Sequence, residues 1–200
     1  MLYAEINMNN DEVLKIFSES GGLLAGHFLL TSGRHSDRYM QCAKLFIDPR
    51  HAESLCAALA QKLQGEKIDL VASPAIGGVV MGYVMAKHLG ARNIFAERNA
   101  DGKMEFRRGF AIKPGERVLV VEDVVTTGGT VVEVAGLVRC SGGELVGAAV
   151  ICDRSAGKVD LGFPLTSLLS IEVTSWEAGD CPICKAGGEP PVKPGSRKRL

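Results

Sequence analysis

The sequence predicts an α/β protein with a central, mostly parallel β-sheet that helices cover on both faces. Residues 70–72 and 118–121, within the expected strands 68–72 and 117–121, and the whole of 145–152 are continuously apolar rather than alternating, which is typical of strands buried on both faces of a sheet. Helical periodicity lies between them, as the crossovers of parallel strands require. With 200 residues, 46% of them hydrophobic, the chain is long enough for one domain with a substantial core.

The first elements are a helix and a hairpin. Asn10 or Asp11 is expected to cap a helix that ends near Ser20. Between Gly26 and Cys42, short apolar pieces flank a polar segment. This pattern predicts a hairpin or a short strand pair.

From residue 48 onward the pattern becomes regular. Asp48 provides a helix cap and Pro49 occupies the first helical position, while leucines at every fourth residue carry the helical period to Gly65. The elements expected beyond it are strands 68–72, 93–96, 117–121, 145–152 and 165–171, and helices 78–89 and 130–141. Segment 98–110 and the tail from Trp176 fall outside this scheme.

Charge and hydropathy exclude several classes of protein. Lys plus Arg and Asp plus Glu both number 23, so the net charge is zero, which disfavours a nucleic acid or a membrane surface as partner. The longest apolar stretch, Leu145 to Cys152, is far shorter than the roughly 20 residues that span a bilayer. Residues 1–15 lack the apolar core of a signal peptide, so we expect a cytoplasmic protein.

Segment 117–130 carries the clearest chemical signal. An apolar strand ends in Glu122 and Asp123, and a loop of threonines and glycines leads into a helix. Backbone N–H groups and the positive helix end converge there, which favours a phosphate. The two carboxylates repel a phosphate, so they are expected to face hydroxyls or a metal-bound part of the same ligand, such as a sugar phosphate. The alternative is an ordinary strand–turn–helix with acidic caps.

This segment resembles the phosphoribosyl-pyrophosphate (PRPP) signature of the type I phosphoribosyltransferases: four apolar residues, two acidic ones and a Thr/Gly loop. Within that family, segment 26–37 resembles the N-terminal hood of the orotate phosphoribosyltransferases, and segment 152–154 resembles their pyrimidine-side segment. The resemblance covers about residues 10–175. It implies a single domain over 1–200, with a hood of about 10–45, a core of about 46–175 and a tail over 176–200.

The resemblance assigns roles around this loop. Glu122 and Asp123 would hold the ribose hydroxyls, with Asp123 also catalytic, and Thr126 and Arg154 would lie at the orotate. The residues that would bind PRPP here are Glu122, Asp123, Val124, Val125, Thr126, Thr127, Gly128, Gly129 and Thr130. A guanidinium fork suits the orotate carboxylate. The alternative for Arg154 is a surface ion pair with Asp153 or Asp160.

A second glycine loop follows strand 68–72. In the resemblance it binds the pyrophosphate of PRPP through Ala75, Ile76 and Gly77, with a cis peptide bond at Ala75–Ile76. Many family members have a Lys where this chain has Gly77, so the positive charge for pyrophosphate must come from elsewhere. The alternative is a tight turn in which glycine serves packing.

Segment 98–109 is the candidate source of that charge. It resembles the family's flexible catalytic loop, which reaches into the neighbouring subunit, and so implies a homodimer with shared sites. Arg98 and Lys103 are the candidate catalytic residues, although this segment has no His and Lys103 is its one Lys. The alternative is a solvated hairpin with scattered charges.

Two features near the C-terminus receive no catalytic role. Cys181 and Cys184 form half a zinc site, but the four histidines are remote in sequence. We therefore expect a structural or redox-sensitive pair without metal, with intersubunit zinc as the alternative. Segment 190–199 is expected to be a frayed basic terminus.

The resemblance implies transfer of the 5-phosphoribosyl group from PRPP to orotate, giving orotidine 5′-monophosphate and pyrophosphate, a step of pyrimidine biosynthesis. Mg²⁺ would be held mainly through PRPP, with no dedicated protein ligands. Three alternatives remain open: a purine phosphoribosyltransferase, a non-catalytic regulator with this fold, and a plain nucleotide-binding module.

Overall fold

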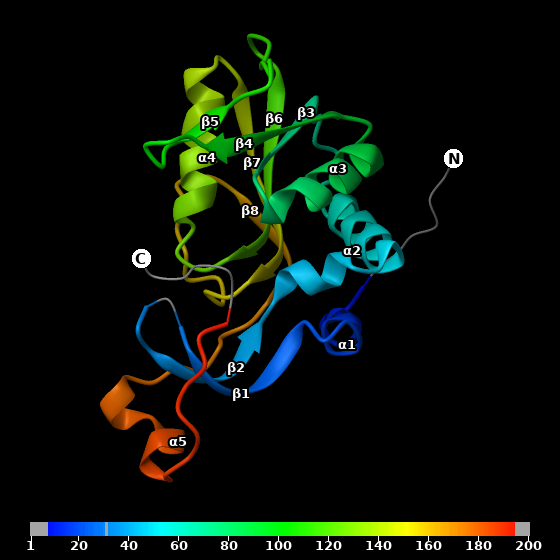
Figure 1. The fold of residues 1–200 in the computed structure, drawn as a ribbon. Coiled ribbons are helices and arrows are strands. Elements are labelled where there is room, and N and C mark those ends of the chain that lie inside the picture. The colour runs from blue at the N-terminus through cyan, green and yellow to red at the C-terminus, as the bar shows by residue number, and fades with distance from the viewer. Residues whose placement is uncertain (1–7, 31, 195–200) are drawn as a thin grey trace.

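A computed structural model describes residues 8–30 and 32–194. The expectations for Thr31 of the hood and for residues 195–199 of the tail lie outside these residues. The elements are α1 (Asn10–Glu19), β1 (Leu23–Leu29), β2 (His35–Met40), η1 (Cys42–Phe46), α2 (Pro49–Gln61), β3 (Leu70–Pro74), α3 (Gly77–Leu89), β4 (Arg92–Arg98), β5 (Met104–Phe106), β6 (Arg117–Val125), α4 (Gly129–Cys140), β7 (Glu144–Asp153), β8 (Leu165–Ser170), η2 (Ala178–Asp180) and α5 (Pro182–Lys185) (Figure 1).

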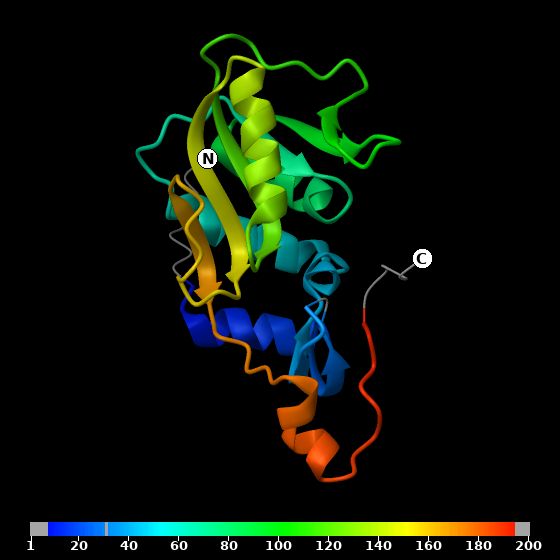
Figure 2. The same ribbon diagram turned by 90° about the vertical axis from the view of Figure 1, so that its left-hand side faces the viewer.

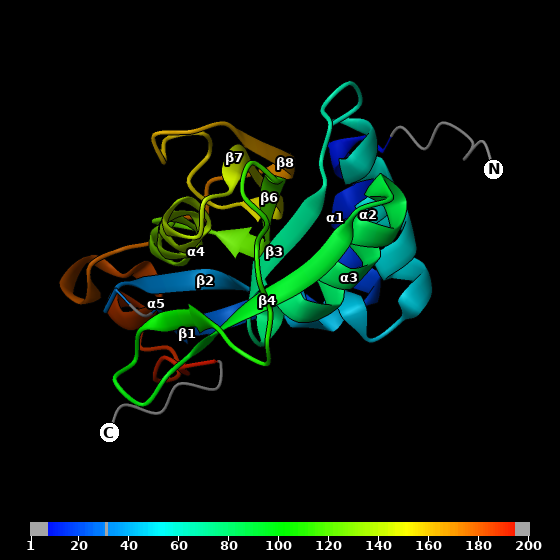
Figure 3. The ribbon, with the colours of Figure 1, turned by 90° about the horizontal axis from the view of Figure 1, so that it is seen from above.

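The expected parallel sheet is confirmed. Within the described residues, six strands form a sheet in the order β5-β4-β3-β6-β7-β8. All neighbours in it are parallel except β4 and β5. Helices α2 and α3 cover one face and α4 covers the other (Figure 3).

Burial on both faces explains the continuous apolar strands. Val71 and Leu119 belong to the core cluster that includes α2 and α3. Their chain neighbours Ala72 and Val120 belong to the cluster under α4. Because successive residues of a strand point to opposite faces, every position of such a strand has to be apolar.

The first helix begins one residue earlier than predicted. Neither Asn10 nor Asp11 caps it, so that prediction is wrong. Asn9 is the cap: its side-chain oxygen accepts from the Glu12 N–H at 3.0 Å, and the Glu12 carboxylate accepts from the Asn9 N–H at 2.8 Å. This reciprocal capping box fixes the start of the helix. For α2, the predicted Asp48 cap is confirmed.

The predicted hairpin is confirmed as β1 and β2, which form a two-stranded antiparallel sheet of their own. This hairpin, the hood, lies beside the carboxyl ends of the main strands, and the chain from residue 171 to 194 runs along it (Figures 1 and 2). The Val192 N–H donates to the His27 carbonyl at 2.8 Å, and the Leu29 N–H donates to the Val192 carbonyl at 2.9 Å. The prediction of a frayed terminus is therefore wrong at Val192.

The same packing brings new neighbours to the cysteine pair near the C-terminus. The histidines are remote from the cysteine pair in sequence, but the fold brings two of them to it. The Cys184 sulfur lies 3.3 Å from His35 Nδ1 and 3.6 Å from His27 Nε2.

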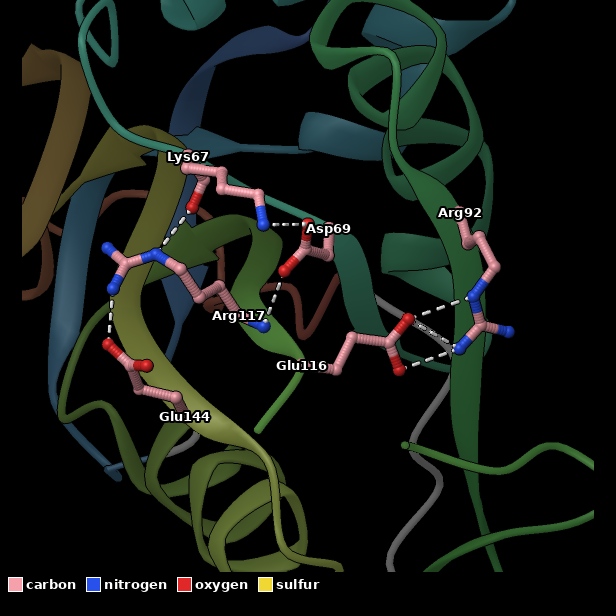
Figure 4. Close-up of polar contacts among 6 residues, drawn as sticks. All are labelled: Lys67, Asp69, Arg92, Glu116, Arg117 and Glu144. Atoms are coloured by element: carbon pink, nitrogen blue, oxygen red, sulfur yellow. Dashed lines mark hydrogen bonds and ion pairs between the residues drawn. The ribbon is translucent and has the colours of Figure 1, made fainter. Parts of the chain in front are cut away.

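Charged residues join the strands at their amino ends. The Asp69 carboxylate accepts from the Arg117 N–H at 3.0 Å, and Arg117 also pairs with Glu144 at the start of β7. Arg92, at the start of β4, forms an ion pair of 2.7 Å with Glu116. The side chains of this amino-edge network are Lys67, Asp69, Arg92, Glu116, Arg117 and Glu144 (Figure 4).

Segment 98–110 is partly regular and contains the hairpin that was the alternative expected for it. Its short strand β5 pairs antiparallel with the end of β4, with Glu97 opposite Glu105. Asn99 closes the turn between them, since its side-chain oxygen accepts from the N–H groups of Asp101 and Lys103 at 3.0 Å. A hairpin therefore extends from the sheet edge.

Candidate functional site

The candidate site lies at the carboxyl ends of β3, β6 and β7. These strands are neighbours in the sheet, so the loops that follow them meet at one edge. Ligands of open α/β sheets bind at this edge. Two cavities of about 490 Å³ and 730 Å³ lie there, and both are lined by Glu122 and Thr130.

The larger cavity surrounds the loop between β6 and α4. Its lining includes Val124, Val125, Thr126, Thr127, Gly128, Gly129 and Thr130, the whole loop predicted from the sequence. Thr126, Thr127 and Gly129 are exposed, so their polar groups are accessible. Because α4 begins at Gly129, the unpaired N–H groups and positive dipole of its first turn lie at the cavity.

Gly128 is the position in this loop that demands glycine. Its φ is +77°, in the left-handed region, where a side chain is strained. A Cβ there would also lie 2.2 Å from Leu161 Cδ2, a core atom. The loop conformation therefore depends on Gly128 for two independent reasons.

The smaller cavity lies over the start of α3. Ala75, Ile76 and Gly77 line it, and the expected cis peptide bond at Ala75–Ile76 is confirmed. The Ile76 side chain is 89% exposed, so the loop offers its backbone and an uncovered apolar side chain to this space. The sequence predicted this loop as part of the site, and the structure places it beside Glu122.

The two adjacent carboxylates occupy different positions. Glu122 lines both cavities. Asp123 is half-buried and lines neither cavity. Its carboxylate lies behind the Ala75–Gly77 loop, since a Cβ on Gly77 would lie 3.6 Å from Asp123 Oδ2. Burial raises the pKa of Asp123, although the N–H groups of Val124 and of Asp123 itself oppose the shift.

Arg154 follows β7 and lines the larger cavity. Its backbone N–H donates to the Val125 carbonyl at 2.9 Å, which ties it to the end of β6, next to the loop that leads into α4. Among the described residues its guanidinium forms no ion pair, and its buried Nε has no hydrogen-bond partner. The alternative of a surface ion pair with Asp153 or Asp160 is therefore wrong. A buried donor without a partner fits an anionic ligand.

Asp153 supports this arginine instead of neutralising it. The Asp153 carboxylate, 2% exposed, accepts from the N–H groups of Ser155 at 2.7 Å and Gly157 at 2.8 Å. Burial alone would raise the pKa of Asp153, but hydrogen bonds from the Ser155 side chain, from these two N–H groups and from Ser170 hold it below its usual value. The charged carboxylate thus fixes the turn that follows Arg154.

The two candidates from segment 98–109 are placed differently. Arg98 lines the smaller cavity of its own chain, where it forms an ion pair of 2.9 Å with Glu133 of α4. Lys103 is exposed on the β4–β5 turn, and its ammonium forms no hydrogen bond or ion pair with the described residues. Of the two, the structure brings only Arg98 to the cleft of its own chain.

The hood supplies cavity walls that the sequence did not single out. Leu30, Ser32 and Tyr39 line the larger cavity from the hood, and Val173 and Ser175 line it from the segment after β8. The hood resemblance pointed to this region without naming these residues. Arg34 fastens the two parts together, because its Nε donates to Ser175 Oγ at 2.9 Å.

Comparison with known proteins agrees with this geometry. The phosphoribosyl transferase domain family matches residues 47–182. A protein of Pelotomaculum thermopropionicum named orotate phosphoribosyltransferase is 54% identical over 96% of this chain and 100% of its own length. The Thermotoga maritima protein of that name is 49% identical over 92% of this chain and 98% of its own length.

A solved structure supports the same grouping. The crystal structure of orotate phosphoribosyltransferase from Aeropyrum pernix superposes with a TM-score of 0.67 at 25% identity, covering 79% of this chain and 93% of that one. The family match spans most of the sheet and both glycine loops, and the relatives extend over the hood. The chain therefore belongs to the phosphoribosyltransferase family and, within it, to the orotate phosphoribosyltransferases.

Proposed function

We propose that the protein transfers the 5-phosphoribosyl group from PRPP to N1 of orotate, giving orotidine 5′-monophosphate and pyrophosphate in pyrimidine biosynthesis. The observation that carries this is Arg154: a buried guanidinium nitrogen without a partner in the same cavity as the phosphate loop. Orotate differs from uracil by a carboxylate, and a guanidinium fork is the matching group. The full-length relatives named for this activity support the same reaction.

The cleft orders the substrate along the sheet edge. The 5-phosphate binds the amides and hydroxyls of the Thr126–Thr130 loop, and Glu122 holds the ribose hydroxyls, with the Asp123 carboxylate behind the Ala75–Gly77 loop. Ala75, Ile76 and Gly77 receive the pyrophosphate, with positive charge from Arg98. Because Glu122 and Thr130 line both cavities, the ribose lies where the cavities meet, with orotate on the Arg154 side.

Catalysis in this arrangement is electrostatic. As the bond from C1 to pyrophosphate lengthens, positive charge develops on the ribose and negative charge on the leaving group. Asp123 and Glu122 stabilise the first, while Arg98 and the loop amides stabilise the second. Orotate is already an anion at neutral pH, so the reaction needs no obligatory general base.

The donor set of the smaller cavity fits Mg²⁺. Glu97 and Glu122 line it, and carboxylate oxygens are ligands that this hard cation prefers, although both Glu97 oxygens also accept from Arg108. We propose that Mg²⁺ binds mainly through PRPP, with Glu122 nearest on the protein side. When bound, the ion neutralises charge on the departing pyrophosphate.

We propose a homodimer in which segment 98–109 of one subunit completes the other's site. Two mixing experiments test it: Lys103→Ala with Asp123→Asn, and Arg98→Ala with Asp123→Asn. When a loop residue acts in trans, half the dimers are mixed and each has one intact site, so activity recovers to about a quarter of wild type. Since Arg98 lines its own chain's cavity, we expect this recovery from the Lys103 pair. No recovery in either mixture, with subunit exchange verified, rules out sharing.

We also propose that hood, core and tail form one domain that works in the cytoplasm. All the cysteines are free in the structure, as the reducing cytosol keeps them. Within residues 8–30 and 32–194, no helix is long and apolar enough to cross a bilayer.

A base panel tests the proposed reaction. The protein is incubated with PRPP, Mg²⁺ and, separately, orotate, uracil, hypoxanthine or adenine, and pyrophosphate release is followed. We expect release with orotate and at least 100-fold less with the others. Release with hypoxanthine or adenine instead would indicate a purine phosphoribosyltransferase. Binding of PRPP without release for any base would indicate a regulator or a nucleotide-binding module.

A further inference from the structure

Four side chains from distant parts of the chain come together where the hood strands meet the C-terminal segment. His27 comes from β1, His35 from the start of β2, and Cys181 and Cys184 from the turn that contains α5. Their ligand atoms all lie within 4.8 Å of one another. Cys181 is completely buried, and His35 is 7% exposed. We propose that these residues form a structural zinc site of the Cys₂His₂ type.

The distances match a tetrahedral ion. With Zn–N bonds of about 2.0 Å and Zn–S bonds of about 2.3 Å, tetrahedron edges are about 3.3 Å between nitrogens and about 3.5 Å between nitrogen and sulfur. The two histidine nitrogens are 3.0 Å apart. The nitrogen–sulfur distances are 3.4 Å for His27 to Cys181, 3.6 Å for His27 to Cys184 and 3.3 Å for His35 to Cys184.

Hydrogen bonding alone leaves this cluster unsatisfied. His27 Nδ1 lies 2.7 Å from the Glu189 carbonyl oxygen, and a carbonyl only accepts, so Nδ1 carries the proton. Nε2 of neutral His27 is then a single lone pair facing His35 Nδ1, Cys181 and Cys184. One lone pair cannot accept from three donors, whereas one cation at the centre binds all four atoms.

The contact with Glu189 has a second consequence. A metal-bound histidine usually donates its other ring N–H to a carbonyl or carboxylate, which fixes its tautomer and orientation. His27 is held in this way. The charges also balance, because each thiol releases its proton on binding and two thiolates neutralise one Zn²⁺.

The site would join the hood to the segment after β8. The N–H groups of His35 and Trp176 each donate to the other's carbonyl at 2.8 Å, so the backbones are already paired next to the cluster. Ser175 precedes that pair and lines the larger cavity. The zinc would thus fix one wall of the base-binding cavity without touching substrate.

Metal content tests the proposal. The untagged full-length chain, purified under reducing conditions, should contain about one zinc per chain by inductively coupled plasma mass spectrometry. Cys184→Ser and His27→Gln should each lower that content at least tenfold. Cys140→Ser is the matched control, since Cys140 is an exposed free thiol at the end of α4, and it should keep the zinc.

Cobalt gives a readout that does not depend on the variants folding. After chelation, the wild-type chain titrated with Co²⁺ should show tetrahedral and thiolate-to-cobalt absorption that saturates at about one equivalent. The chelator should also lower the melting temperature of wild type and of Cys140→Ser, but leave that of Cys184→Ser unchanged.

Three results would overturn the proposal. The first is less than about a tenth of an equivalent of bound metal after equimolar Zn²⁺ is added and the excess removed. The second is a cobalt spectrum without thiolate bands. The third is a Cys181–Cys184 disulfide, found by mass spectrometry in the reduced preparation, in place of the metal.

Discussion

The two edges of the sheet differ in how far their charged side chains are paired. At the amino edge, the charged side chains pair with one another: Arg92 with Glu116, Lys67 with Asp69, and Arg117 with Glu144 (Figure 4). At the carboxyl edge, Arg154 forms no ion pair among the described residues, and Asp123 is half-buried with a raised pKa. Ion pairs between side chains link neighbouring strands, whereas a charged side chain without a partner in the protein is available to bind a ligand.

Aspartates at the two edges show the same contrast. The pKa of Asp69 is lowered, first by the hydrogen bond from the Arg117 N–H and then by Lys67. The pKa of Asp123 is raised because burial outweighs its backbone hydrogen bonds. The ionised form of Asp69 therefore stabilises the fold. The ionised form of Asp123 destabilises it, and binding of PRPP would offset that destabilisation.

The largest expected effect is at Asp123. Asp123→Asn should lower kcat at least about 100-fold, as loss of a group that stabilises transition-state charge does. The same change should raise the melting temperature at pH 7. Because the folded carboxyl has a pKa above its ordinary value of 3.8, stability falls as pH rises from that value through the folded pKa. Circular dichroism melts should therefore show the gain at pH 7 and none well below pH 3.8.

If Asp123→Asn instead lowers the melting temperature at pH 7, Asp123 has a structural role. It would then no longer distinguish the carboxyl edge from the amino edge.

The next effect concerns Arg154. Arg154→Ala should weaken orotate binding about 10- to 100-fold, since a hydrogen bond to a charged group contributes about 1.5–3 kcal/mol. PRPP binding should change little. Arg154→Lys keeps the charge without the planar fork and should lie between the two. Isothermal titration with each substrate separates these outcomes, and an equal loss for both substrates would contradict the placement of orotate.

A glycine at each edge gives a matched pair. Gly128 and Gly115 both have positive φ, +77° and +73°, but a Cβ on Gly115 meets nothing within 4 Å. Both Ala variants carry a backbone cost of about 1–2 kcal/mol. Gly128→Ala alone forces Leu161 to move, so it should also raise the KM for PRPP about tenfold. A similar rise in Gly115→Ala would show that backbone strain, and not the loop itself, controls binding.

The smallest effect on activity is at the amino edge. Arg92→Ala breaks the pair with Glu116, whose side chain is only 7% exposed, and should lower the free energy of unfolding by about 1–3 kcal/mol. The melting temperature should fall by several degrees, and the kcat and both KM values should not change. A calorimetric melt and a steady-state assay check this. A loss of activity larger than twofold would mean that the two edges are coupled.

The elements whose formation depends on residues close in sequence were predicted from the sequence. The run of apolar residues before Glu122 predicted β6, because a strand covered on both faces has no polar position. Asp48-Pro49 predicted the start of α2 for the same kind of reason. At α1 the prediction missed by one residue. The Glu12 carboxylate forms a capping box with Asn9, three residues earlier, and that Asn–Glu spacing is visible in the sequence.

Long-range contacts were the part that the sequence could not provide. His27 lies beside Cys181, although 154 residues separate them in sequence. No local pattern around either residue predicts this contact. The ion pair of Arg98 with Glu133 of α4 depends in the same way on the position of the β4–β5 hairpin at the sheet edge. Both glycine loops could be read from the sequence, but the joining of their cavities at Glu122 and Thr130 required the structure.

The pairing of β1 with Val192 bears on how the chain folds during synthesis. The partners are far apart in sequence, since Phe28 bridges to Val192. At about 5–20 residues per second, a ribosome needs roughly 10–30 s to make the stretch between them. For most of that time both edges of the hood hairpin lack their partners, because β2 pairs with Trp176 and β1 with Val192, whereas each strand of the main sheet meets a neighbour within a shorter stretch of chain. The hood is thus assembled last from one of the first segments made, and it is the part of the nascent protein most exposed to mispairing with another chain.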